Sequence, residues 1–219
     1  MPFKWLSLVI LLCCYNTAAL KADTQSEQAK PESLTAEELT KMGLDTWYLG
    51  DFVTAMGYLK QADEKGDIKG TVALAKLYHF SSEFDAAVEL LEKARKAGEP
   101  EGTLMLVEYY QYGNGVREKQ PEKARLLLEE LVAADYQPAK LRQAIEIESG
   151  RLGYTQDLHM AFEICLKLAE SGFAPAMQVV HEAYKNGRMG QTINEELATQ
   201  WFQRITNTIK SDKISVGDY

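Results

Sequence analysis

The sequence contains few of the side chains on which catalysis and metal binding usually depend. Among 219 residues there are three cysteines and three histidines. The motifs H-E-x-x-H, G-x-S-x-G, S-x-x-K and C-x-x-C are missing, and so is a phosphate-binding glycine loop. His79, His159 and His181 fall in three different predicted helices, which favours packing or surface roles over a shared metal site. We therefore expect no catalytic residues, no metal and no cofactor, and a protein that is not an enzyme.

A concentrated positive charge is also missing. The chain carries 24 Lys and Arg against 32 Asp and Glu, a formal net charge of -8, and its basic residues are dispersed. Proteins that bind nucleic acid need basic patches to neutralise phosphates, so we expect no nucleic-acid partner. Hydrophobic residues make up 46% of the chain, which is enough for a sizeable core.

Long hydrophobic runs are absent as well. The longest largely apolar stretch, 5–14, covers ten residues including Ser7 and is too short to span a bilayer. Lys4 precedes it and small residues follow at 17–19, which is typical of a secretory signal peptide. We assign residues 1–22 to this signal peptide, with cleavage near Ala19 or Ala22. We expect a periplasmic or secreted protein with no membrane span after cleavage.

The segment that follows is polar. Residues 23–33 lack periodicity and contain Pro31, which indicates a flexible leader.

Cysteines are too few for a disulfide framework. Cys13 and Cys14 lie in the signal peptide, and the large residues before Cys13 argue against a lipidated cysteine. Cys165 is then the one thiol of the mature chain, so stability must come from packing. We interpret Cys165 as a buried hydrophobic residue of a helix. The alternatives are an intermolecular disulfide and a redox sensor.

The sequence does contain an internal repeat. The segment 121–139, PEKARLLLEELVAADYQPA, matches 158–176, LHMAFEICLKLAESGFAPA, 37 residues on. Repetition at such a period indicates stacked helical pairs, in which each pair covers the apolar face of its neighbour. An alanine near the start of each predicted second helix sets the register, and apolar residues recur three, four and seven positions later, on one helix face. The anchors are Ala55, Ala87, Ala124, Ala161 and Ala198; the residues four on are Leu59, Leu91, Leu128, Cys165 and Phe202.

The predicted first helices fall into the same register. Eleven residues after the anchors, Gly66, Gly98, Asp135 and Gly172 are suited to end a helix in the left-handed conformation. Small residues four positions further on allow close helix contacts, and a capping box at 35–38 starts the first helix. We place the helical repeat domain at 34–210 and a C-terminal tail at 211–219. The small residues are Gly70, Gly102, Ala139 and Ala176.

The segment 106–139 resembles a Sel1-like repeat, a relative of the tetratricopeptide repeat. The resemblance rests on Tyr110, Gly113, Gly115-Val116, Lys123-Ala124 and Ala139. The first two pairs lack a five-residue loop extension that the later three carry, and they look closer to tetratricopeptide repeats. Where the family has a close-packing glycine, this chain has Ala75, Val107, Ala144 and His181 in successive pairs.

The resemblance covers about 35–207 and implies an all-α fold, a right-handed α-solenoid of about five antiparallel helix pairs. Such repeats are generic binding scaffolds, so we expect a non-enzymatic scaffold that assembles or regulates a cell-envelope complex. An alternative comes from the same family, because some cysteine-rich exported Sel1-like proteins are linked to β-lactam binding and hydrolysis. Those proteins staple each repeat with a cysteine pair, which this chain lacks.

In a solenoid of this kind the first helices line the concave face, where a protein or peptide partner would bind. Aromatic residues flanked by polar ones are typical anchors at interfaces. The alternative is that the aromatic residues only complete the packing between repeats. The sequence carries no signal for an oligomeric state. The predicted partner-binding residues are Trp47, Tyr48, Lys76, His79, Phe80, Glu108, Gln111, Tyr112, Ile145, Glu148, Glu182 and Lys185.

Overall fold

The computed structural model describes residues 34–116 and 118–216, and the side chains of residues up to 208. The predicted signal peptide and leader lie outside this part. Within it the chain forms ten helices, of which the first nine have 13 residues each and the last has 22. The helices are α2 (Ala36–Tyr48), α3 (Phe52–Glu64), α4 (Ile68–Phe80), α5 (Phe84–Lys96), α6 (Pro100–Tyr112), α7 (Pro121–Ala133), α8 (Gln137–Ser149), α9 (Leu158–Glu170), α10 (Ala174–Asn186) and α11 (Glu195–Val216).

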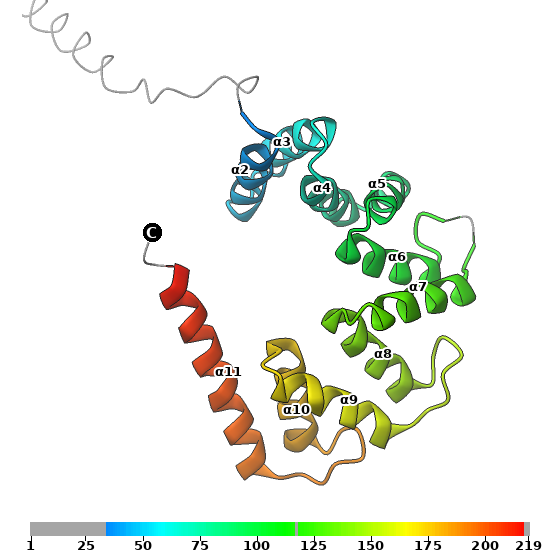
Figure 1. Cartoon of the computed structure of the whole chain (residues 1–219), viewed down its shortest axis with the longest axis vertical. Helices are drawn as coiled ribbons and strands as arrows, with labels where there is room; N and C mark the ends of the chain where they lie inside the picture. Colours follow the sequence, from blue (N-terminus) through cyan, green and yellow to red (C-terminus); the bar gives the residue numbers. More distant parts are fainter. Residues whose placement is uncertain (1–33, 117, 217–219) are drawn as a thin grey trace, which may run out of the picture.

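These helices stack as five antiparallel pairs along a curved path (Figure 1). The first helices, α2, α4, α6, α8 and α10, line the inner side of the curve, and α3, α5, α7 and α9 lie outside them. Helix α11 packs on α10 and ends the stack. The all-α solenoid of five pairs that the sequence predicts is therefore confirmed.

The helix ends follow the expected local chemistry. The side chain of Thr35 accepts a hydrogen bond from the Glu38 amide, and the Glu38 carboxylate accepts one from the Thr35 amide at 2.8 Å. The four predicted terminators all adopt the left-handed conformation, including the one that is not glycine, Asp135, with φ of 63°. A β-carbon has little strain there when the side chain is short and polar.

Loop length separates the two kinds of repeat, as predicted. The first two pairs are joined internally by three residues each, 49–51 and 81–83, whereas eight residues separate α6 from α7, α8 from α9 and α10 from α11. The longer loops contain glycines with positive φ, such as Gly113 at 82°. A β-carbon on Gly115 would collide with the carbonyl oxygen of Phe84, so this loop packs directly against the preceding pair.

The core consists of the predicted helix faces. The anchor alanines of the first four pairs are fully buried, and so are the residues four positions later, from Leu59 to Cys165. Close contacts between first and second helices use small residues: a β-carbon on Gly70 would lie 2.8 Å from that of Ala62. Such positions set how near the backbones can approach.

Phe202 is the exception, and its predicted burial is wrong. Its side chain is 57% exposed, while Trp201 beside it is buried. In the first four pairs the residue at this position is fully buried, and Leu91 lies beside Gly102 of the next pair. No described helix follows α11, so Phe202 keeps contact only with its own pair, where its ring lies 5.8 Å from that of His181.

The last helix, α11, extends beyond the predicted end of the repeat domain at residue 210. It continues to Val216, through most of the segment interpreted as a C-terminal tail. A search of the described helices finds none with both the length and the apolarity that crossing a membrane requires.

Candidate functional site

The structure places the predicted partner-binding residues on the first helices, and it separates them by exposure. Tyr48 is 91% exposed and Phe80 63%. Tyr112, Glu108 and Lys185 are also exposed. Trp47, Ile145 and Glu182 are half-buried. The exposed aromatic side chains are not fully covered by packing between repeats.

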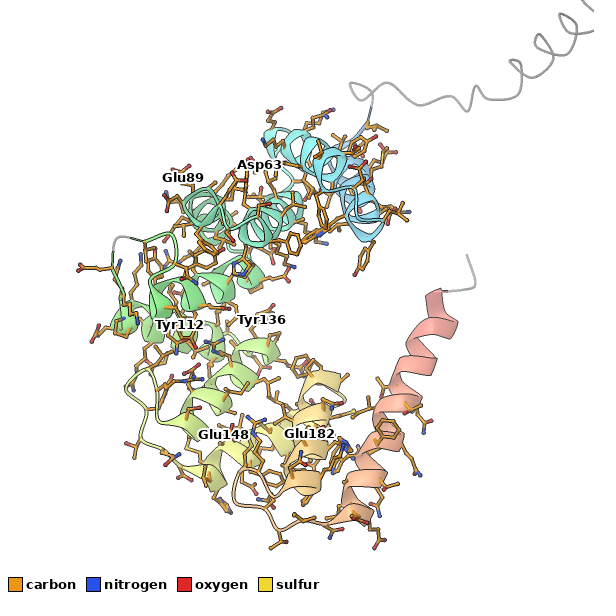
Figure 2. All side chains as sticks on the ribbon, turned by 180° about the vertical axis from the view of Figure 1, so that it is seen from behind. Asp63, Glu89, Tyr112, Tyr136, Glu148 and Glu182 are labelled. Carbon is orange, nitrogen blue, oxygen red and sulfur yellow. The ribbon has the colours of Figure 1, made fainter. Side chains whose placement is uncertain are left out.

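Several of the predicted residues contact their own protein instead. The Nδ1 atom of His79 is hydrogen-bonded to the Tyr109 hydroxyl at 2.8 Å, and Lys76 forms an ion pair with Glu101 at 2.6 Å. Two nitrogen atoms of Arg188 donate to the two carboxylate oxygens of Glu148, at 2.7 and 2.5 Å. Glu148 and Glu182 lie on the neighbouring helices α8 and α10 (Figure 2). These contacts tie adjacent pairs together.

Gln111 is buried in a polar network that connects α6 to α8. Its side-chain nitrogen donates to the carboxylate of Glu146 at 3.0 Å, and its oxygen accepts from Arg142 at 2.5 Å. Glu146 is fully buried between Arg142 and Arg151, at 2.7 and 3.0 Å. Nothing in the helical pattern singles out Glu146, because a buried carboxylate becomes visible only when its partners are in place. Gln111 therefore has a structural role that its sequence position does not reveal.

The exposed aromatic side chains gather at the N-terminal end of the concave face. Leu44, Trp47 and Tyr48 from α2, Phe52 from the start of α3 and Phe80 from the end of α4 line a pocket of about 560 Å³ together with Lys76. We call this pocket the aromatic groove. The rings of Phe52 and Phe80 stack with centroids 4.9 Å apart and an interplanar angle of 20°. Phe52 escaped the sequence analysis because it belongs to a second helix, and only the short turn after Tyr48 brings it to the concave side.

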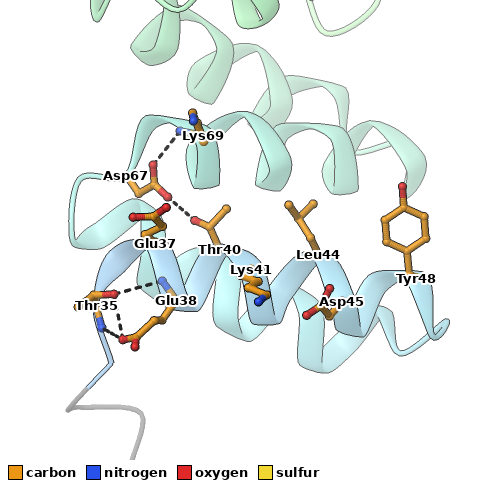
Figure 3. Close-up of a pocket in the computed structure, with 10 residues that line it drawn as sticks. All are labelled: Thr35, Glu37, Glu38, Thr40, Lys41, Leu44, Asp45, Tyr48, Asp67 and Lys69. Atoms are coloured by element: carbon orange, nitrogen blue, oxygen red, sulfur yellow. Dashed lines mark hydrogen bonds between the residues drawn. The ribbon is translucent and has the colours of Figure 1, made fainter. Parts of the chain in front are cut away.

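A second pocket, whose lining includes several charged residues, adjoins the aromatic groove along α2. It has a volume of about 720 Å³, and Leu44 and Tyr48 line both pockets. Figure 3 shows Thr40, Leu44 and Tyr48 extending from α2 towards α4, with Lys41 and Asp45 along the near side. Four carboxylates and two lysines line it, so its lining carries a formal charge of -2; they are Glu37, Glu38, Asp45 and Asp67 with Lys41 and Lys69. We call this pocket the acidic groove.

Two of these carboxylates are held by neutral partners. Glu38 accepts the hydrogen bonds of the capping box, which lower its pKa. Asp67 accepts from the Thr40 hydroxyl at 2.5 Å and from the Lys69 amide at 3.0 Å. Neither contact neutralises the negative charge.

A metal site requires several metal-binding side chains close together, and a reactive thiol requires a lowered pKa. No set of three His, Cys, Asp or Glu side chains that could hold a metal ion occurs in the described part of the chain. Cys165 is a free, buried thiol, as predicted for a core position, and burial raises its pKa to about 11. A thiol with so high a pKa is a poor nucleophile at neutral pH.

Comparisons with known proteins identify the fold. No family model matches the sequence, and no curated protein matches it. Among solved structures, a Sel1 repeat protein from Oxalobacter formigenes is 18% identical with a TM-score of 0.58, covering 77% of this chain and 69% of its own. A sel1 repeat protein from Klebsiella pneumoniae subsp. pneumoniae is 20% identical with a TM-score of 0.55, covering 86% and 97%.

A third similar structure is a protective antigen of uropathogenic Escherichia coli strains, which has an SLR fold. It is 23% identical with a TM-score of 0.53, over 80% of this chain but only 39% of the antigen. At these identities the likeness concerns the fold, which is that of Sel1-like repeat proteins.

Proposed function

We propose that this chain, whose fold is the Sel1-like repeat solenoid, is an exported, non-enzymatic scaffold that binds a protein or peptide partner on its concave face. The observation that carries the proposal is the aromatic groove. Soluble proteins seldom leave several large apolar side chains exposed together unless the patch binds something. Here the patch lines a pocket, and charged residues of the acidic groove adjoin it on one side, as polar residues often flank protein-binding surfaces.

The Sel1-like fold supports an interaction role rather than a catalytic one, because its repeats present an extended concave surface. The N-terminal sequence pattern supports export, and we place the partner in a cell-envelope or secreted complex.

Affinity capture from the native cell envelope tests the binding role. We expect a partner to be retained by the wild-type chain and lost with the double variant Trp47→Ala/Tyr112→Ala. Leu126→Ala is the control, because Leu126 is an exposed apolar residue of the outer helix α7. Equal retention by the double variant, with unchanged helicity by circular dichroism, would contradict the proposal.

Export is tested separately, by mass spectrometry of the N-terminus in the periplasmic and secreted fractions. We expect a mature chain that begins after Ala19 or Ala22. A full-length chain confined to the cytoplasm would refute export and leave the binding role to be judged by capture.

A further inference from the structure

We infer that the aromatic groove and the acidic groove together hold one extended segment of the partner, which places an aromatic or large aliphatic side chain in the aromatic groove and a Lys or Arg beside Asp45. This inference rests on the proposed function, and it assigns the site and the chemistry of the segment that occupies it. Four observations lead to it.

The first observation is the exposure of apolar side chains around the turn between α2 and α3. Besides Tyr48 and Phe80, Leu49 and Val53 project into solvent there, and both are exposed. Phe52 and Phe80 already stack on each other, so an aromatic or aliphatic side chain placed on them would extend an existing apolar surface.

The second observation concerns the cation of the aromatic groove. Lys76 lines this groove, but Glu101 neutralises it at 2.6 Å. The groove therefore offers no free positive charge to an acidic segment.

The third observation is the position of Asp45. It lies in the last turn of α2, which contains no basic residue, and a carboxylate there is disfavoured by the negative end of the helix dipole. Its side chain is exposed and forms no ion pair with another described residue. Lys41 lies one turn earlier on the same side of α2 but forms no ion pair with Asp45 (Figure 3), so this carboxylate is available to a cation from a partner.

The fourth observation is that the two grooves adjoin each other. They share Leu44 and Tyr48 and follow α2 over its 13 residues, a length of about 20 Å at the helical rise. An extended chain covers that length with about six residues. Because the acidic groove carries a charge of -2 on a chain of charge -8, a basic segment is favoured over an acidic one.

Peptide display on the full-length protein tests the inference. The probe is a library of random twelve-residue peptides, followed by a fluorescently labelled synthetic copy of the most enriched peptide. We expect enriched peptides to combine an aromatic or large aliphatic residue with Lys or Arg within about six positions. The affinity of the labelled peptide, measured by fluorescence anisotropy, should fall as salt increases.

Matched variants locate the binding site. Phe80→Ala should weaken the peptide roughly ten-fold or more, as for an interface anchor, whereas Phe202→Ala, at a similarly exposed ring, should not. Asp45→Lys should weaken it by a similar factor, whereas Glu89→Lys, on the outer helix α5 (Figure 2), should not. Tyr48→Ala tests the role of the aromatic groove in peptide binding without loss of stability, because so exposed a side chain contributes little to folding.

The outcomes separate the inference from the proposed function. Binding that survives Phe80→Ala and Asp45→Lys but is lost with Tyr112→Ala would overturn the inference and keep the concave-face scaffold. Enrichment of acidic or uncharged peptides would overturn the inference as well. If no peptide is enriched and no envelope partner is captured, both the inference and the proposed function are wrong.

Discussion

At Gly70 the α4 backbone lies close to the preceding pair. A β-carbon there would sit 2.5 Å from the Thr40 hydroxyl and 2.8 Å from the Ala62 side chain. Thr40 is itself held by Asp67, so α2 and α4 would have to separate.

We therefore expect Gly70→Ala to lower the free energy of unfolding by about 1–3 kcal/mol. The control is Gly57→Ala, since Gly57 is also helical and has no heavy atom within 4 Å of an added β-carbon. That change should raise stability by about 0.5–1 kcal/mol, because alanine favours a helix. Urea denaturation measures both, and equal effects would contradict the close approach.

Cys165 gives a second prediction at this scale. Its burial and its pKa of about 11 should make it unreactive at neutral pH. Iodoacetamide at pH 8 should leave the Cys165 peptide unlabelled in the folded protein and label it after denaturation, as seen by mass spectrometry. Rapid labelling of the folded protein, or a disulfide dimer through Cys165, would favour the redox alternative.

At the scale of elements, a buried carboxylate joins α6 to α8. Removing Glu146 would leave Arg142 and Gln111 without the acceptor they share, although the arginine side chains keep contact with solvent. We expect Glu146→Ala to cost about 1–3 kcal/mol of unfolding free energy, the penalty for a buried polar group left without its partner. Glu89→Ala should stay within about 0.5 kcal/mol, as is usual for an exposed site. Similar losses in both variants, measured by urea denaturation, would show that the network is not specific.

The pKa of Tyr109 indicates how the stability of the packing between α4 and α6 changes at alkaline pH. Burial raises the pKa of Tyr109 to about 12 from its usual 10, so the folded state keeps the phenol proton longer than the unfolded state does. The resulting stability is complete below pH 10 and is lost as pH rises through 12, at up to about 1.4 kcal/mol per pH unit.

Thermal unfolding between pH 9 and 12 measures this loss. Tyr109→Phe should flatten the decline above pH 10, even though the variant also loses the hydrogen bond to His79. An unchanged slope would show that other groups cause it, such as Tyr110 and Tyr136, whose pKa values burial also raises.

At the scale of the whole molecule, stability should vary along the solenoid. A central pair is covered on both sides, whereas α11 has a described neighbour on one side only and exposes Phe202. In repeat proteins each pair is stabilised chiefly by its neighbours. We expect amides of α11 to exchange with deuterium faster than those of α6 and α7, as mass spectrometry would show. Equal protection along the chain would mean that the solenoid opens as a single unit.

The sequence predicted the fold well because the same small and apolar positions recur in each pair. Ala87, Leu91 and Gly98 have counterparts one period away, and each is explained by local helix chemistry or by contact with the next pair. Phe202 was predicted wrongly since its burial requires a helix that no described residue supplies. The repeat pattern reflects the contacts of a pair that has another pair on each side, and among the described residues the last pair lacks one of these neighbours.

The candidate site was predicted less completely. Trp47, Tyr48 and Phe80 line one pocket, which Phe52 joins from α3, whereas Gln111 is buried and hydrogen-bonded to Glu146. Which side chains share a groove depends on how two pairs sit against each other, and a helical period contains no such information.

By itself the amino-acid sequence determined the helices, their ends, their pairing and the faces they bury, because each depends on contacts between residues close in the chain or one period apart. The tertiary structure alone decided which aromatic side chains remain in solvent, which carboxylates are paired and where the concave face is hollowed. Those properties depend on the spacing and angle between neighbouring pairs, which arise only when the whole stack is assembled.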